Sequence, residues 1–228
     1  MSDKSGRFIS IAIDGPASAG KSTLAKRLAK KLGFEYLNTG ALYRACAVYV
    51  MESGIDCGET AKIEELFGRG GVEVHVNYTD GEQRTYLNGK DITGQIAGTD
   101  SLSIPSSTVS NIQKVRDFLL RPQREAAEAN NITMEGRDIG TVILPNADVK
   151  IYLTAAPEKR AERRHAEKPG KTYETVLREI NERDAQDAAK MVPAADAVTL
   201  DNTDYSFGET LAEALKIVKE KLPDVCIR

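Results

Sequence analysis

Strand-like apolar runs alternate with helix-spaced apolar positions over the first fifty residues. Residues 8–13 form a β-rich apolar run. Apolar positions at helical spacing follow and stop before Gly33, namely Leu24, Ala25, Leu28, Ala29 and Leu32. A second apolar run at 34–37 and a helical pattern over 41–51 continue this alternation. The order strand, helix, strand predicts an α/β fold with a parallel sheet flanked by helices.

The alternation changes to a period of two between residues 71 and 93. Val72, Val74, Val76 and Tyr78 alternate with polar residues, and the dipeptides Asp80-Gly81 and Asn88-Gly89 follow. Because such dipeptides favour tight hairpin turns, the pattern predicts an inserted three-strand antiparallel meander at about 72–93. The Gly-, Ser- and Thr-rich stretch 94–106 is predicted to be a return linker.

The remaining chain returns to the α/β alternation. Strands are predicted at 132–135, 149–153 and 197–200, and helices at 109–129, 157–167, 172–190 and 208–222. Pro122 is expected to kink or divide the first of these helices. We therefore predict a single domain with a core of residues 1–70 and 107–228, an acceptor-binding insert at about 71–106, and a helical lid at about 157–190.

Composition excludes several classes of protein. The 228 residues include 31 Lys and Arg against 34 Asp and Glu, so the net charge of −3 argues against a protein that binds a nucleic acid polymer with its whole surface. No apolar run approaches the ~20 residues of a membrane span, and the polar N-terminus does not resemble a signal peptide. The three scattered cysteines indicate reduced thiols. We expect a cytoplasmic protein that contacts no membrane.

The most specific motif lies between the first predicted strand and the first predicted helix. Residues 15–22 read GPASAGKS and match the phosphate-binding loop pattern GxxxxGK[ST]. Backbone N–H groups of such a loop and the positive end of the following helix bind phosphates. Lys21 is expected to reach the β- and γ-phosphates of ATP, and the Ser22 hydroxyl to bind Mg²⁺.

Several arginines distinguish the chain from other P-loop proteins. The base-reading NKxD motif and the DxxG motif of GTPases are absent, and the chain is short for a motor ATPase. Arginines suit an acceptor that carries its own phosphate. Arg44, one turn into the helix that follows the second strand, predicts a second anion site, although an ordinary helix start with a solvated arginine fits equally well.

Three further groups are candidates for the same site. Arg137-Asp138 follows a strand and fits a phosphate and base contact or a local ion pair. Arg160, Arg163 and Arg164 share a helix face and fit a lid over the phosphates, although the alternating charges also fit a solvated helix. Further candidates for contacts with phosphate, ribose or base are Arg183, Asp187, Arg116 and Ser107.

These motifs resemble those of bacterial cytidylate kinases, which belong to the P-loop nucleoside monophosphate kinases. The resemblance covers nearly the whole chain and is carried by IAIDGPASAGKST, NTGALYR, LNGKDIT, VRDFLLRPQR, MEGRDIGT, VKIYLTA, INERD and VPAADA. It implies a cytoplasmic enzyme that transfers the γ-phosphoryl group of ATP to CMP or dCMP with Mg²⁺. We expect a monomer.

The resemblance also implies roles for individual residues. ATP would be bound by the loop Gly15, Pro16, Ala17, Ser18, Ala19, Gly20, Lys21, Ser22 and Thr23, with Arg160 and Arg163 from the lid. The acceptor's phosphate and sugar would be held by Thr39, Tyr43, Arg44 and Arg137, and also contacted by Arg183 and Asp187. Cytosine would be read by Ser107, Arg116 and Asp138. Lys21, Arg137 and Arg164 would stabilise the transition state.

The chain departs from the family pattern at three places. Ala17-Ser18 stands where many members have Ser-Gly, Ile96-Ala97 where relatives often have Ile-Arg, and Lys190 where relatives have an arginine that meets phosphate. Three alternatives remain open: a kinase of another small acceptor such as UMP, AMP or a sugar, a nucleotide-dependent switch that binds a protein partner, and a protein whose meander is an interaction module.

Overall fold

The computed structural model describes residues 7–79, 81–97, 100–167 and 170–228, and its chain forms two compact units. The first takes in Met1–Tyr36 and Asn130–Arg228, and the second Leu37–Ala129. Some predicted positions lie outside the described residues, namely Asp80 of the predicted turn, residues 98–99 of the predicted linker and residues 168–169 of the predicted lid.

A parallel sheet forms the framework of the first unit, and its strand order is β2-β6-β1-β7-β8. The central strand β1 pairs in parallel with β6 and β7, and β7 pairs in parallel with β8. The carboxyl ends of β1 and β6 are therefore neighbours. The strands are β1 (Ser10–Asp14), β2 (Glu35–Asn38), β6 (Ile132–Glu135), β7 (Val149–Thr154) and β8 (Val198–Asp201). The predicted α/β fold class is confirmed.

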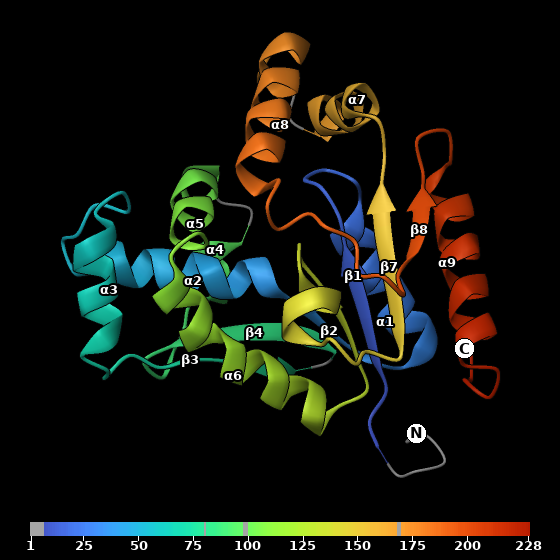
Figure 1. Ribbon diagram of the computed structural model, residues 1–228, viewed down its shortest axis with the longest axis horizontal. Coiled ribbons are helices and arrows are strands. Elements are labelled where there is room, and N and C mark those ends of the chain that lie inside the picture. Colours follow the sequence, from blue (N-terminus) through green and yellow to red (C-terminus); the bar gives the residue numbers. More distant parts are fainter. Residues whose placement is uncertain (1–6, 80, 98–99, 168–169) are drawn as a thin grey trace. The chain divides into compact units, whose positions relative to one another are not determined.

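Two helices, α1 (Lys21–Leu32) and α9 (Phe207–Lys221), pack against the sheet and against each other (Figure 1). Buried residues of both helices join those of β1, β7 and β8 in one core, which includes Ile11, Leu28, Ile151 and Val218. Helix α1 ends where the sequence predicts, because Gly33 takes the left-handed conformation at φ 68° and its N–H bonds to the Ala29 carbonyl.

The predicted lid consists of two helices that pack together, α7 (Pro157–Glu167) and α8 (Tyr173–Asp187). Ala161 of α7 and Val176 and Ile180 of α8 form a small core of their own. The prediction for α7 is correct to the residue, whereas α8 ends three residues earlier than predicted. No described helix is both long enough and apolar enough to cross a membrane.

The second unit contains the predicted meander. Strands β3 (Val74–Thr79), β4 (Glu82–Leu87) and β5 (Lys90–Asp91) form an antiparallel sheet in that order. Asn88 and Gly89 turn the chain between β4 and β5 with φ of 49° and 78°, as the dipeptide predicts. The unit's helices are α2 (Thr39–Glu52), α3 (Thr60–Gly68), α4 (Thr93–Ile96), α5 (Ser103–Val109) and α6 (Gln113–Ala129), with a 3₁₀ turn at Asp100–Leu102.

Two sequence predictions for this unit are wrong. The described residues of 94–106 do not form a plain linker but lie mostly in short helices, because α5 packs on α2 and buries Ser106 and Val109 on one face. Pro122 does not divide α6, which runs without interruption from residue 113 to 129, so the predicted division is wrong, while the alternative, a kink, stays a prediction. In the same turn, the buried Gln123 side-chain amide donates to the Leu119 carbonyl at 2.7 Å, one residue beyond the Phe118 carbonyl that the proline leaves without its helical N–H.

Candidate active site

The phosphate-binding loop connects β1 to α1, and its backbone conformation requires glycine at two positions. A Cβ on Gly15, whose φ is 141°, would lie 2.0 Å from the Leu153 carbonyl oxygen of β7. Gly20 precedes α1 at φ 92°. Ser18 also has a positive φ of 60°, a region that usually favours glycine and costs other residues roughly 1–2 kcal/mol. The loop is thus held in a backbone shape that few other sequences accept.

Lys21 is the first residue of α1 and its side chain turns back into the loop. Its Nζ donates to the Pro16 carbonyl at 2.6 Å, and the residue is only 5% exposed. Burial lowers the pKa of Lys21 well below its usual value, and the nearby Arg137 lowers it further. The ammonium is therefore costly to keep charged without an anion.

The hydroxyl of Ser22 lies against an acidic side chain that the sequence analysis assigned no role. Its Oγ donates to Glu135 Oε1 at 2.8 Å, and the Tyr36 hydroxyl lies 3.4 Å from the same oxygen. Glu135 is the last residue of β6 and is 5% exposed. A hydroxyl and a carboxylate are the hard oxygen groups that suit Mg²⁺, so the pair fits the metal that the loop motif implies.

The Gly136-Arg137-Asp138 segment leaves β6 beside the end of β1. The Gly136 N–H donates to the Ile13 carbonyl at 3.0 Å and extends the β1–β6 pairing. After Asp138 the chain makes a π-helical turn over Ile139–Ile143. Asp14, the last residue of β1, accepts hydrogen bonds from the first two N–H groups of this turn, those of Ile139 at 2.7 Å and Gly140 at 2.8 Å.

The Asp187 carboxylate lies within 4 Å of three cationic side chains that were named in the sequence analysis. Its Oδ2 accepts from Arg137 Nε at 3.0 Å and lies 3.9 Å from Arg183 Nε, while its Oδ1 lies 3.6 Å from Lys190 Nζ. The Asp187 side chain is only 5% exposed. A buried carboxylate needs such partners. The group is a concentration of positive charge that one carboxylate only partly offsets.

The α7 arginines differ in their surroundings. Arg160 is 3% exposed and holds the Ala17 carbonyl of the loop at 3.1 Å, together with both carboxylate oxygens of Asp184 at 3.1 and 2.6 Å. Arg163 donates to Asn202 Oδ1 at 3.0 Å, and Asn202 Nδ2 donates to the Ala19 carbonyl at 3.1 Å. Both arginines therefore brace the loop, directly or through Asn202.

Arg164 differs from these two arginines because its side chain is 37% exposed. Its ion-pair distance to Glu167 is 3.6 Å. A pair this open to solvent contributes little to stability. Its guanidinium is the one of the three that a bound anion can reach with least rearrangement.

In the second unit, the start of α2 carries the predicted anion site. The Asn38 side chain caps the helix by accepting from the Ala41 N–H at 3.3 Å. A Cβ on Gly40 would lie 3.1 Å from Asn38 Oδ1 and 3.6 Å from Arg44 Nη1. The glycine therefore leaves room for Arg44 close to the positive end of the helix, where an anion is favoured.

The predicted base-reading residues of the second unit lie on α5 and α6. Arg116 Nη1 donates to the Tyr43 hydroxyl at 3.3 Å and to the Ser110 carbonyl at 3.4 Å, so Arg116 and Tyr43 are in contact. The Ser107 hydroxyl oxygen is buried and has no hydrogen-bond partner among the described residues. Nearby Ser106, Thr108 and Ser110 instead bond to carbonyls three or four residues back. A buried hydroxyl without a hydrogen-bond partner is suited to bind a ligand.

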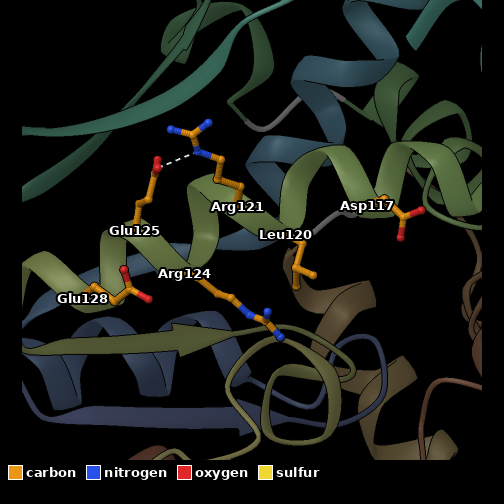
Figure 2. Close-up of a pocket in the computed structure, with 6 residues that line it drawn as sticks. All are labelled: Asp117, Leu120, Arg121, Arg124, Glu125 and Glu128. Carbon is orange, nitrogen blue, oxygen red and sulfur yellow. Dashed lines mark hydrogen bonds and ion pairs between the residues drawn. The ribbon is translucent and has the colours of Figure 1, made fainter. Parts of the chain in front are cut away.

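A shallow depression of about 370 Å³ lies along α6 (Figure 2). It is lined by Asp117, Leu120, Arg121, Arg124, Glu125 and Glu128. Arg121 Nε bonds to Glu125 at 2.7 Å, and the mixture of charges gives the depression no single preference for an anion or cation. The phosphate-binding loop with its buried Lys21 is therefore the better candidate.

The model of the family described as "Cytidylate kinase" matches residues 11–220. The chain belongs to the cytidylate kinase family. The cytidylate kinase of Thermotoga neapolitana is 46% identical over 220 residues, which cover 93% of this chain and 97% of the relative. The cytidylate kinase of Bacillus licheniformis is 40% identical over 219 residues, which cover 92% and 96%. The resemblance stated from the motifs is confirmed.

Among solved structures, a shikimate kinase from Bacteroides thetaiotaomicron shares the fold. Its TM-score is 0.50 at 14% sequence identity, and the match covers 94% of this chain and 98% of that one. At this identity the likeness concerns the fold alone.

Four residues of this cytidylate kinase family member were missed by the sequence analysis: Asp14, Glu135, Asp184 and Asn202. Asp14 and Glu135 had a readable signal, because each is an acidic residue at the end of a mostly apolar strand, next to a motif. Asp184 and Asn202 had none, because their partners are 24 and 39 residues away in the sequence.

Proposed function

We propose that the chain transfers the γ-phosphoryl group of ATP to CMP and dCMP. The observation that carries the proposal is the loop of Gly15–Thr23 with its buried Lys21, in a chain of the cytidylate kinase family. We also propose a cytoplasmic monomer, as the resemblance to the cytidylate kinases implies. We also retain the division into a core, an insert at 71–106 and a lid at 157–190 as part of the proposal.

On the donor side, the loop's backbone N–H groups and the start of α1 bind the ATP phosphates. Lys21 gives up its bond to Pro16 and contacts the β- and γ-phosphates. Ser22 and Glu135 hold Mg²⁺, directly or through water, and the metal when bound offsets phosphate charge. The raised cost of charging the buried Lys21 supports this assignment, because a bound phosphate removes that cost.

On the acceptor side, Thr39, Tyr43, Arg44 and Arg137 hold the phosphate and sugar of CMP, and Ser107, Arg116 and Asp138 read cytosine. The Ser107 hydroxyl, which has no hydrogen-bond partner among the described residues, supports the base contact, because cytosine offers both a donor and acceptors. Arg183 and Asp187 contact phosphate and ribose. Lys190 adds charge beside Asp187 but lacks the fork of an arginine.

The arginines of α7 have two different roles. Arg164 closes on the transferring phosphoryl group, and Arg160 and Arg163 act on ATP mainly by fixing the loop that binds it. Their bonds to Ala17 and, through Asn202, to Ala19 support this division.

The chemistry rests on positioning and charge. Phosphoryl transfer passes through a loose transition state in which charge spreads over the equatorial oxygens, so the enzyme gains most by aligning the two nucleotides and surrounding the oxygens with cations. Lys21, Arg137 and Arg164 supply that charge. No general base is assigned, because the acceptor is itself a phosphate anion. Closure of the lid keeps water from the γ-phosphate.

A coupled ADP-release assay with ATP and Mg²⁺ tests the proposal, with CMP, dCMP, UMP and AMP offered in parallel. Fast turnover on CMP and dCMP alone is expected. Turnover on another acceptor would overturn the base-reading roles of Ser107, Arg116 and Asp138. ATP binding without acceptor-dependent turnover would favour a nucleotide-dependent switch instead.

A further inference from the structure

The segment Arg137-Asp138 is fixed at both ends by the last two residues of β1. Before it, the Gly136 N–H donates to the Ile13 carbonyl at 3.0 Å. After it, the N–H groups of Ile139 and Gly140 donate to the two carboxylate oxygens of Asp14 at 2.7 and 2.8 Å. The Asp14 carboxylate thus holds the start of the turn that follows Arg137-Asp138 with two hydrogen bonds.

The Asp14 carboxylate and the turn that it holds are buried and closely packed. Asp14 is 7% exposed, so its carboxylate has little access to water. A Cβ on Gly140 would lie 3.1 Å from Lys150 Cδ and 3.4 Å from Asp14 Oδ2, so the turn packs closely on both side chains. Asp14 also directly precedes Gly15, the first residue of the phosphate-binding loop.

We propose that Asp14 is a positioning residue for acceptor binding, which holds the Ile139–Ile143 turn so that Arg137 and Asp138 stay in place. It does not itself touch either nucleotide. This inference rests on the proposed function, which gives Arg137 the acceptor phosphate and Asp138 the base. The new element is a dependence between the two sides of the site. The segment Arg137-Asp138, which binds the acceptor, depends on the carboxylate of Asp14, which ends the strand that leads into the phosphate-binding loop.

The decisive variant is Asp14→Asn, which keeps the size of the side chain and one acceptor oxygen. The other oxygen becomes an NH₂ group that faces a backbone N–H, so one of the two bonds is lost. A hydrogen bond to a charged group contributes about 1.5–3 kcal/mol, so the KM for CMP should rise about 10- to 100-fold. The KM for ATP should stay within about twofold, because the loop's own contacts are intact.

The matched control is Asp148→Asn. Asp148 also accepts a backbone N–H of β1, that of Ser10 at 2.8 Å, but at the opposite end of the strand. Its substitution should leave both KM values unchanged. Equal increases in the two KM values of Asp14→Asn, or no increase for CMP, would overturn the inference.

Amide hydrogen exchange provides a second measurement that needs no turnover. The N–H groups of Ile139 and Gly140 should exchange faster in Asp14→Asn than in the wild type, and unchanged exchange would contradict the inference. If the wild type fails to phosphorylate CMP, the proposed function fails, while exchange still reports whether Asp14 holds the turn. If Asp14→Asn does not fold, Gly140→Ala displaces the turn with Asp14 intact and should raise the KM for CMP in the same way; an unchanged KM would again overturn the inference.

Discussion

Nε of Arg137 donates to Oδ2 of Asp187 at 3.0 Å, which ties a guanidinium expected to hold the acceptor's phosphate to a carboxylate expected to contact its ribose. The Arg137 side chain is 20% exposed, and that of Asp187 is 5% exposed. The ion pair therefore orients Arg137 before a nucleotide binds, and reduces the rearrangement that binding requires.

Arg137→Ala should lower kcat about 10²–10³-fold, because it removes a preoriented donor to the transition state. Arg137→Lys should be intermediate, since lysine keeps the charge and loses the fork. Steady-state kinetics with CMP measures both. Arg121→Ala is the control, because Arg121 is exposed and its ion pair is with the neighbouring Glu125 of the same helix. An unchanged kcat in Arg137→Ala would exclude the assigned role.

Lys21→Met should abolish turnover while leaving the protein as stable as the wild type or more so. Burial lowers the pKa of Lys21 well below its usual value, so the buried amine is costly in the folded protein. A gain of ~1 kcal/mol would raise Tm by about 2–4 °C. Lys150→Met is the contrast, because Lys150 is paired with Asp196 at 2.8 Å and its loss should lower Tm. A Tm for Lys21→Met below that of Lys150→Met would contradict this prediction.

Gly15→Ala should destabilise the protein more than Gly20→Ala. The new Cβ at position 15 meets the Leu153 carbonyl oxygen at 2.0 Å, whereas at position 20 the nearest atom is 3.9 Å away. Gly20→Ala should cost about 1–2 kcal/mol from its positive φ alone, and Gly15→Ala more than that. Urea denaturation of the two variants measures the difference, and equal losses would rule out the close approach as the cause.

Ser18→Gly should be neutral to mildly stabilising. Relief of the positive φ gains roughly 1–2 kcal/mol, and the added freedom of the unfolded chain returns about 0.5–1 kcal/mol of it. Ser18→Ala retains the Cβ and should show no such gain, so it separates backbone relief from loss of the hydroxyl. Thermal unfolding of the three proteins tests this, and a clear fall in Tm for Ser18→Gly would refute it.

Asp14 should make stability depend on pH in an unusual direction. Burial raises its pKa from 3.8 to about 6, helped by the charge of Asp138 and opposed by the Ile139 and Gly140 N–H groups and Lys21. Between these values the folded state binds a proton that the unfolded chain has released, so the free energy of unfolding falls as pH rises. The contribution, about 3 kcal/mol, is fully present below pH ~4 and lost above pH ~6.

The comparison of wild type with Asp14→Asn isolates this effect, because the other acids titrate in both proteins. The difference in free energy of unfolding, measured from pH 4 to 7, should change with pH in favour of Asp14→Asn as pH rises. A difference independent of pH would show that Asp14 keeps an ordinary pKa.

Several features of the protein follow from short-range physics and can be predicted from the sequence alone. The loop pattern of residues 15–22, the helix end at Gly33 and the turn at Asn88-Gly89 each depend on a few neighbouring residues, because φ preferences and alternating polarity act locally. The same locality explains why the meander and α7 were predicted accurately.

Other features depend on long-range packing that no short stretch of sequence reveals. Residues 103–109 are helical because α2 buries one face of them, which their Ser- and Thr-rich composition does not reveal. Asp14 meets the turn after Asp138, and Ser22 meets Glu135, only because β1 and β6 are neighbours in the sheet. Arg160 holds the phosphate-binding loop by donating to the Ala17 carbonyl, 143 residues away in the sequence. Such contacts depend on which strands and helices pack together, and that choice is made by burial of the whole core and not by any local pattern.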